Sequence, residues 1–471
     1  MSTTEQARSF CDDTMGYYGH SLTRLMSQPD AEREEIQLAA LKYRFQQLRE
    51  SVQMVKKLAD NEGVAEIKTF NDVVPLLFDH TMYKSYPVSL LYEGQFVKLT
   101  RWLSKLTAVD LSGFDAADCH TLDDWLIALY DRTPLNVVST SGTSGASSFL
   151  PRSKQNWHNF MQQYPVMLMQ EFGKETPVEK FPLNMHAMYP YFRSGAGHLL
   201  LNELYVKYIC GAEERFHAAY PGRLSPDVLL LTQRMRVAAA KGELDRLDIS
   251  PEMKSKRDDF VKLMENRDEH IARFFDDIGR KLRGERVFMQ AVPGMLHQMA
   301  KTGLARGDRG LFARNSLIVS GGGAKGAVLT EDWEETVKEF LGVDRVAVLY
   351  GMGEMLFYFV RCDHGRYHTS PGVIPFVLDP ETSQPLPRTG TVTGRWAHYD
   401  LGVDAHWGGF ITGDEVTMHW DDACPCGRKT PFLDQTIRRF SEISKGSDKI
   451  TCAATQDAYD DAMDFLVGAE V

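Results

Sequence analysis

The run Ser139-Thr140-Ser141-Gly142-Thr143-Ser144-Gly145 consists of small hydroxyl residues and glycines, and it follows the apolar segment 135–138. Glycines let a backbone turn tightly with its N–H groups pointing inward, and hydroxyl groups add hydrogen-bond donors without bulk. The run therefore predicts a loop that wraps a phosphate group, although a flexible Ser/Gly linker has the same composition. It is not a P-loop, because the G-x-x-x-x-G-K-[ST] spacing is missing.

A second glycine-rich run, Ser320-Gly321-Gly322-Gly323-Ala324-Lys325-Gly326, lies between a predicted strand at 316–319 and a predicted helix at 331–341. It satisfies G-x-G-x-x-G, the pattern of dinucleotide-binding turns. Such a site needs an acidic residue at the end of the following strand, yet Asp344 precedes that strand, which we expect at 346–349. A nicotinamide-dependent dehydrogenase is therefore the weaker alternative for this run.

Two carboxylates follow predicted strands. Glu354 ends the run Tyr350-Gly351-Met352-Gly353-Glu354, directly after the strand at 346–349. Strands that alternate with helices imply a parallel sheet, and such sheets place ligands at the carboxyl ends of their strands. Glu354 is thus a candidate Mg²⁺ ligand, unless it merely begins a solvated helix. Asp414 ends the run 410–414, where it could accept both hydroxyls of a ribose or simply belong to a hairpin turn.

In this order, from about Val137 to Ile450, these segments resemble the core motifs of adenylate-forming enzymes, the family of acyl-CoA synthetases, nonribosomal-peptide adenylation domains and luciferase. The Gly-rich run at 320–326 and the Cys-Pro-Cys-Gly-Arg segment at 424–428 look most like acyl-protein synthetases and phenylacetate-CoA-ligase-like proteins. The resemblance implies an α/β fold, the family's large N-terminal domain, in which parallel and mixed sheets pack against helices beside a small antiparallel β subdomain.

The resemblance also implies a site for Mg·ATP. The loop 140–145 would hold the phosphates, the turn 322–324 and Tyr350 the adenine, Asp414 the ribose and Glu354 the magnesium ion. The implied nucleotide-binding residues are Thr140, Ser141, Gly142, Thr143, Ser144, Gly145, Gly322, Gly323, Ala324, Lys325, Tyr350, Gly351, Met352 and Asp414. The implied catalytic residues are Glu354, Arg438, Arg439 and Lys449.

The implied reaction is the activation of a carboxylic acid. A substrate carboxylate attacks the α-phosphate of ATP, pyrophosphate leaves, and the acyl-adenylate passes to a thiol or an amine. Catalysis of this kind consists mainly of positioning and of neutralising charge on the phosphate oxygens. The candidate acceptors are CoA, an acyl-carrier protein and an amine. A non-catalytic ATP- or AMP-binding family member that regulates or scaffolds a partner is the alternative.

The sequence departs from the family pattern in three places. The predicted phosphate loop lacks the usual Pro-Lys close behind it, and Pro151-Arg152 comes later. Gly353 stands where the family has a threonine before the magnesium ligand, and only about twenty residues follow Ile450. Family members usually carry a mobile domain with a catalytic lysine there, and we expect most of that domain to be missing. Cys452, with Lys449 nearby, is a candidate acyl acceptor, although an incidental buried cysteine is the alternative.

Four further residues have side chains that suit a structural zinc ion, namely Cys362, His368, Cys424 and Cys426. Sulfur and imidazole are the ligands that tetrahedral zinc prefers, and Asp363 or His364 would support a ligand from behind. Ordinary turn and core residues are the alternative. His186 and Tyr189, in an aromatic segment, lie where family members line the acyl pocket, with core packing as the alternative.

The composition of the 471 residues is that of an ordinary globular protein, and the net charge of −11 argues against nucleic-acid binding. No stretch approaches about eighteen consecutive apolar residues. We therefore expect a cytoplasmic protein with reduced cysteines, no nucleic-acid or membrane partner, and a homodimer as a candidate assembly. Its expected parts are a helical segment at 1–130, an α/β ATP-binding core at 131–370, a β-rich subdomain at 371–440 and a vestigial C-terminal segment at 441–471. Within the core, the insertion at about 225–285 is expected to be a solvated helical hairpin.

Overall fold

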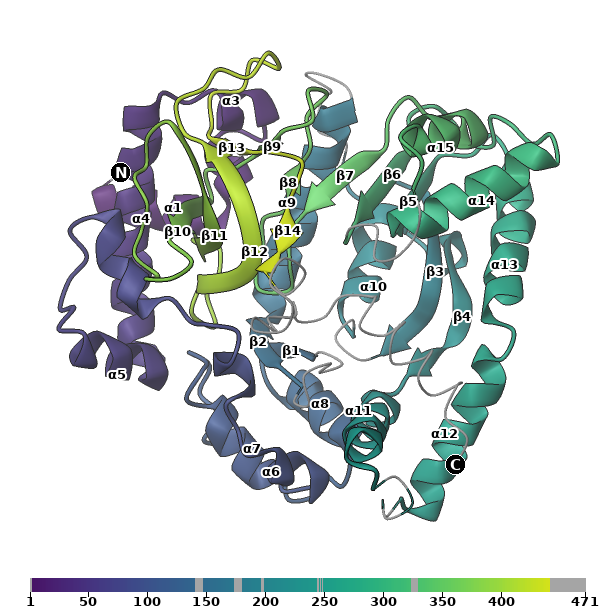
Figure 1. Ribbon diagram of the computed structural model, residues 1–471, viewed down its shortest axis with the longest axis horizontal. Coiled ribbons are helices and arrows are strands. Elements are labelled where there is room, and N and C mark those ends of the chain that lie inside the picture. Colours follow the sequence, from purple (N-terminus) through teal and green to yellow (C-terminus); the bar gives the residue numbers. More distant parts are fainter. Residues whose placement is uncertain are drawn as a thin grey trace. The chain divides into compact units, whose positions relative to one another are not determined.

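The computed structural model in Figure 1 describes residues 2–139, 147–172, 180–195, 199–243, 245, 247, 249–322 and 329–440. They divide into two units, each assembled from stretches that are distant in the sequence. The described residues of 1–138, 148–163 and 350–440 form the first unit, and those of 164–349, with Ser139 and Ser147, form the second. These units differ from the linear boundaries expected at 130 and 370, because the last strands pack with the N-terminal helices.

Some helices of the first unit begin at polar side chains that cap them. Ser2 and Glu5 form a capping box at α1, and Thr121 and Asp124 form another at α8. These side chains satisfy N–H groups that have no partner within the helix, so they fix where each helix starts. The helical segments are α1 (Thr3–Asp12), α2 (Thr14–Tyr17), α3 (Leu22–Met26), α4 (Asp30–Ser51), α5 (Gln53–Asn61), η1 (Phe70–Leu76), η2 (Met82–Lys84), α6 (Val88–Tyr92), α7 (Phe96–Leu103), α8 (Leu122–Arg132) and α9 (Lys154–Phe172), which continues into the second unit.

An antiparallel sheet with the strand order β10-β11-β12-β13-β9 completes the first unit. Helix α4 lies beside it (Figure 1), and Gln37 of this helix donates to the carbonyl groups of Pro371 and Val373. Arg44 lies about two turns further along the same face of α4 and donates to the carbonyl group of Leu401. The strands of this sheet are β9 (Tyr367–His368), β10 (Val373–Leu378), β11 (Thr391–Asp400), β12 (Gly409–His419), β13 (Phe432–Leu433) and β14 (Arg438–Arg439), which pairs with β12. The short strand β8 (Phe359–Val360) is not part of it, and β1 (Leu135–Ser139) and β2 (Phe149–Ser153) form a separate two-stranded sheet.

A parallel sheet with the strand order β4-β3-β5-β6-β7 forms the centre of the second unit. Strands β5 and β6 are almost entirely buried, as parallel strands covered on both faces are expected to be. The strands are β3 (His186–Gly195), β4 (Phe216–Leu224), β5 (Val287–Ala291), β6 (Leu317–Gly321) and β7 (Ala347–Tyr350). The alternation of strands and helices predicted for 287–349 is therefore present.

The prediction of a solvated hairpin at 225–283 is wrong in two respects. Three helices occupy the segment, α11 (Pro226–Lys241), α12 (Pro251–Met264) and α13 (Arg267–Lys281). Most of the first half of α11 is buried, including the polar residues Asp227, Thr232 and Gln233, because it carries the apolar run 228–231. Gly242 ends α11 with a φ of 68°, a left-handed conformation that favours glycine.

The remaining helical segments of the second unit follow its strands. Helices α14 and α15 pack closely where Gly303 faces Phe340, and a Cβ atom at Gly303 would lie 2.0 Å from that ring. The segments are α10 (Leu201–Leu204), η4 (Tyr205–Cys210), η5 (Glu213–Arg215), α14 (Pro293–Ala305) and α15 (Trp333–Leu341).

Parallel and antiparallel sheets packed with helices confirm the predicted α/β fold class with its additional antiparallel part. Among the helices of the described ranges, none combines the length and the apolar character needed to cross a membrane.

Candidate functional site

Tyr350, Asp414 and Arg439 lie together in the first unit. The Tyr350 hydroxyl donates to Asp414 Oδ2 at 2.8 Å, and Arg439 Nε is 3.9 Å from Asp414 Oδ1. The pairing of β12 with β14 sets this contact, because it places Arg439 opposite Asp414. Asp414 is largely buried, so its carboxylate interacts with these groups with little screening by water.

Arg438, the other predicted cation in β14, occupies a different place. It lies opposite Glu415 in the strand pairing and forms an ion pair with that carboxylate, and its own side chain is mostly exposed. Neighbouring residues of a strand point to opposite faces of a sheet, so only one of the two arginines can reach Asp414. The geometry favours Arg439 as the cation of this cluster.

The ring of Tyr350 is surrounded by other aromatic rings. Phe359, Tyr367 and Trp396 have ring centroids 6.1 to 6.4 Å from the centroid of Tyr350. These rings and the hydrogen bond to Asp414 fix the orientation of the phenol group. The neighbouring Gly351 leaves room for Tyr358, whose ring would lie 2.2 Å from a Cβ atom at that position.

Glu354 is buried in a turn, with 6% of its surface exposed, and does not begin a helix. Arg152 of β2 donates through Nη2 to the carbonyl group of Gly353 at 2.5 Å and also to that of Met355. A carboxylate is the kind of hard oxygen ligand that Mg²⁺ prefers, and Mg²⁺ usually takes only one or two from the protein. The chemistry of this side chain fits a magnesium ion.

The other end of the Glu354 turn is held by Asp400. Its Oδ2 accepts hydrogen bonds from the N–H groups of Leu356 at 2.6 Å and Phe357 at 3.2 Å. Burial raises the pKa of Asp400 to about 6, while these backbone donors and Arg152 oppose that rise. Burial lowers the pKa of Arg152 from its ordinary value.

Several predicted residues lie outside the described ranges, so their surroundings stay predictions. They are Thr140, Ser141, Gly142, Thr143, Ser144, Gly145, Gly323, Ala324, Lys325, Lys449 and Cys452. Of the predicted adenine turn, Gly322 is described, and its φ of 90° is a conformation that favours glycine. Met352, next to Gly351, is buried.

His186 and Tyr189 lie on β3. His186 begins the strand, at the amino end of the parallel sheet, and its Nδ1 is 3.1 Å from Nε2 of His217. Burial lowers the pKa of both imidazoles, and the pKa of His217 falls to about 4. Tyr189 is 7% exposed and packs against the rings of Tyr205 and Phe216. The assignment of His186 and Tyr189 to an acyl pocket stays a prediction.

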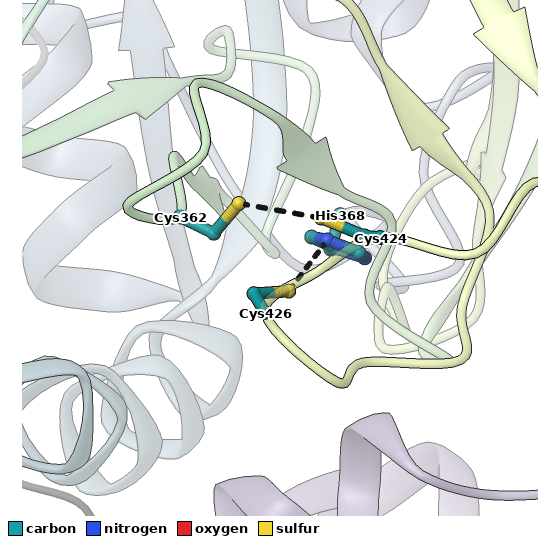
Figure 2. A group of neighbouring side chains, drawn as sticks. All are labelled: Cys362, His368, Cys424 and Cys426. Carbon is teal, nitrogen blue, oxygen red and sulfur yellow. Dashed lines mark hydrogen bonds between the residues drawn. The ribbon is translucent and has the colours of Figure 1, made fainter.

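Cys362, His368, Cys424 and Cys426 point toward one another, as Figure 2 shows, and their ligand atoms all lie within 4.8 Å. The Sγ atoms of Cys362 and Cys424 are 3.9 Å apart, and Sγ of Cys426 is 3.2 Å from Nε2 of His368. Two thiolates on one tetrahedral zinc ion would be about 3.8 Å apart, given a Zn–S distance of about 2.3 Å. The donor set and its spacing therefore fit a tetrahedral metal ion.

Two tight turns and one strand present these ligands. Cys362 starts a turn in which its N–H group donates to Arg366, and Cys424 starts another that closes when Gly427 donates back to it. Gly427 has a φ of 85°, so a side chain there would be strained. Strand β9 carries His368 and pairs with β13, which begins at Phe432, shortly after the second turn.

The imidazole of His368 is oriented from behind by the backbone. Its Nδ1 is 3.1 Å from the carbonyl oxygen of Thr430, which can only accept, so Nδ1 carries the proton and Nε2 faces the thiols. Burial lowers the pKa of His368 to about 4 and raises the pKa of Cys426 to about 12. Asp363 and His364, expected in this supporting role, are exposed, and the Thr430 carbonyl takes their place at His368.

Sequence reasoning missed Arg152 and Asp400 as parts of the site. Arg152 is 2% exposed within a strand whose five residues are all buried. A single arginine in an apolar run was the available signal, because a buried charge requires dedicated partners.

No family model and no curated protein matches the sequence. Among solved structures, the chain is similar to 2-hydroxyisobutyryl-CoA ligase in complex with 2-HIB-AMP and CoA, with 15% identity and a TM-score of 0.49 over 88% of this chain and 71% of that one. It is also similar to ATP-bound MatB from Rhodopseudomonas palustris, with 16% identity and a TM-score of 0.31 over 67% and 52% of the two chains. Both are adenylate-forming enzymes, the family whose motifs the sequence resembles.

Proposed function

We propose that this chain activates a carboxylic acid as an acyl-adenylate at the expense of Mg·ATP and transfers the acyl group to a thiol or an amine. The observation that carries the proposal is the cluster of Tyr350, Asp414 and Arg439, which the family motifs assign to the nucleoside and to charge neutralisation. The buried Glu354 adds a carboxylate that suits magnesium. The cluster and Glu354 belong to the first unit, and the phosphate loop is supplied by the sequence motif alone.

Each residue has a distinct part in this proposal. Asp414 accepts hydrogen bonds from ribose hydroxyls, and Tyr350 holds that carboxylate in place while its ring meets the adenine. Arg439 lies beside the Asp414 carboxylate and supplies positive charge near the nucleotide. Glu354 would hold the magnesium ion, which when bound neutralises the phosphate oxygens.

The bond changes follow from the chemistry of ATP. An oxygen of the substrate carboxylate forms a bond to the α-phosphorus, and the bond from that phosphorus to the bridging oxygen breaks, which releases pyrophosphate. Attack by a thiol or an amine on the acyl carbon then releases AMP. The chain's own residues bind, orient and neutralise charge, and no nucleophile from the protein is needed.

Carboxylate-dependent exchange between ATP and labelled pyrophosphate tests the proposal across a panel of aryl, fatty and amino acids. We expect exchange with one class of acid, abolished in Glu354→Ala and strongly reduced in Asp414→Ala. Glu415→Gln is the matched control, because Glu415 is the next residue of β12 and faces Arg438 instead. Exchange that survives in Glu354→Ala would contradict the magnesium assignment.

A nucleotide-binding protein without catalytic activity would contain the same cluster. ATP binding that depends on Asp414, combined with no exchange for any acid, would favour that alternative. Adding CoA, an amine or an acyl-carrier protein to the exchange-competent enzyme would then identify the acceptor by release of AMP.

We further propose that Cys362, His368, Cys424 and Cys426 hold one structural zinc ion. Four protein ligands leave no open position, so the ion would tie the two turns together and take no part in catalysis. Metal analysis of the purified protein should find about one zinc per chain. Cys426→Ala should lose it, whereas Cys119→Ala, a buried thiol outside the tetrad, should retain it. Metal content at trace level in the wild type would remove this assignment.

A further inference from the structure

Two buried side chains of opposite charge form hydrogen bonds to the backbone of the turn that contains Glu354. Arg152 binds the carbonyl groups of Gly353 and Met355, the residues on either side of Glu354. Asp400 binds the N–H groups of the two residues that follow Met355. The peptide group between Met355 and Leu356 is therefore held at both ends, its oxygen by Arg152 and its hydrogen by Asp400.

We propose that Arg152 is a positioning residue for Glu354, which it serves by fixing the peptide groups around that carboxylate, with Asp400 as its counterpart. The proposal rests on the proposed function for its link to magnesium, but the clamp itself is a property of the fold. A carbonyl held on each side of Glu354 restricts the backbone angles that aim its side chain. Metal ligands need such support, because a small misplacement of a ligand lowers metal affinity.

The contacts of Arg152 are more specific to the Glu354 turn than a role in general packing would require. The Arg152 side chain packs over the Trp157 ring, 5.0 Å from its centroid, and is screened from water, so its hydrogen bonds act in a medium of low dielectric constant. It directs one nitrogen to two carbonyl groups of the same turn. Lysine has a compact, strongly hydrated ammonium group that is more costly to bury than a guanidinium, so it would replace Arg152 poorly at this place.

Sequence position adds a second argument. Strand β2, which contains Arg152, follows the predicted phosphate loop 140–145 along the chain. One side chain thus connects the strand that leaves the phosphate loop with the turn that carries the proposed magnesium ligand. The two motifs are more than two hundred residues apart in sequence, as the separation of 201 between Arg152 and Gly353 shows.

The test compares Arg152→Met and Arg152→Lys with Arg44→Met. Arg44 is a matched control, since it is equally buried in the same unit and donates to a backbone carbonyl, that of Leu401. Two quantities are measured in each variant, hydrogen exchange of the amides in 353–357 and the Mg²⁺ concentration for half-maximal pyrophosphate exchange. Loss of a charged hydrogen bond should raise that concentration on the order of tenfold in both Arg152 variants.

We expect faster hydrogen exchange in the turn for the Arg152 variants only, at an unfolding midpoint similar to that of Arg44→Met. Equal exchange in the turn for Arg152→Met and Arg44→Met would overturn the clamp. A wild-type protein inactive with every acid would overturn the proposed function instead, and hydrogen exchange would still decide on the clamp.

Discussion

Lowering the pH should destabilise the first unit through His398. Its ring is fully buried on β11, where it stacks on the Trp396 ring and lies near Phe410. Burial lowers the pKa of His398 from 6.5 to about 3. Between these two values the unfolded chain binds a proton that the folded chain does not, so the free energy of unfolding decreases as the pH falls through this window.

The size of the effect follows from the two pKa values. Near pH 7.5 both states are unprotonated at this ring, and the contribution is close to zero. Near pH 5 the unfolded state is protonated and the folded state is not, which removes about 2 kcal/mol of stability, at about 1.4 kcal/mol per pH unit. A buried carboxylate with a raised pKa, such as Asp400, has the opposite effect on stability at pH values below its pKa in the folded state. This effect is the same in all variants, so it cancels when their pH dependences are compared.

The substitution His398→Phe keeps a flat ring and removes the proton-binding site. Urea unfolding is followed by tryptophan fluorescence, which reports on the first unit because Trp333 is the one tryptophan of seven that lies in the second. Between about pH 7.5 and about pH 5, the wild type should lose about 2 kcal/mol more than His398→Phe. His120→Gln, at an exposed histidine, should behave like the wild type. An identical pH dependence in His398→Phe and wild type would refute the reasoning.

Two further substitutions test contacts in each unit. Gly303→Ala should destabilise the second unit by about 1–3 kcal/mol, because its Cβ atom would meet the Phe340 ring. Gly222→Ala, where a Cβ atom meets nothing within 4 Å, serves as its control, and thermal unfolding measures both. Tyr350→Phe should weaken nucleotide binding about threefold to tenfold in calorimetry, since it removes the hydrogen bond to Asp414 but keeps the ring. Unchanged affinity in that variant would show that the phenol hydroxyl does not orient the carboxylate.

The elements of the parallel sheet could be predicted where local sequence carries the signal. The strands at 287–291, 317–321 and 347–350 are short apolar runs between glycines and helix starts, and they lie within a few residues of their predicted positions. The same reasoning was wrong for helix α11. Its charged neighbours suggested a solvated face, whereas its apolar run 228–231 is buried. Burial depends on what packs against an element, which a single segment does not reveal.

Some residues of the candidate site could likewise be predicted from the sequence, and others could not. The Cys and His tetrad could be predicted because few other arrangements bring together four soft ligands, and the structure places them within 4.8 Å. The choice between Arg438 and Arg439 needed the register of β14 against β12, in which a shift by one residue exchanges the two faces. Arg152 escaped prediction because its partners, the carbonyl groups of Gly353 and Met355, are backbone groups that leave no trace in sequence.

Because the Sγ atoms of Cys362 and Cys424 are 3.9 Å apart, we expect the chain to be sensitive to oxidation while the proposed zinc site holds no metal. A disulfide between them would close a loop of 62 residues and restrict the unfolded chain by about 4 kcal/mol, yet it would withdraw two of the four ligands from zinc. Oxidised and metal-loaded chains would then be two mutually exclusive mature forms of one protein. We expect protein purified without reductant to contain less zinc and fewer titratable thiols, and treatment with dithiothreitol and Zn²⁺ to restore both. Zinc content that does not depend on reductant would show that the chain binds zinc before the two cysteines can be oxidised. Whichever event comes first, zinc binding or oxidation, would then decide the final form of the chain.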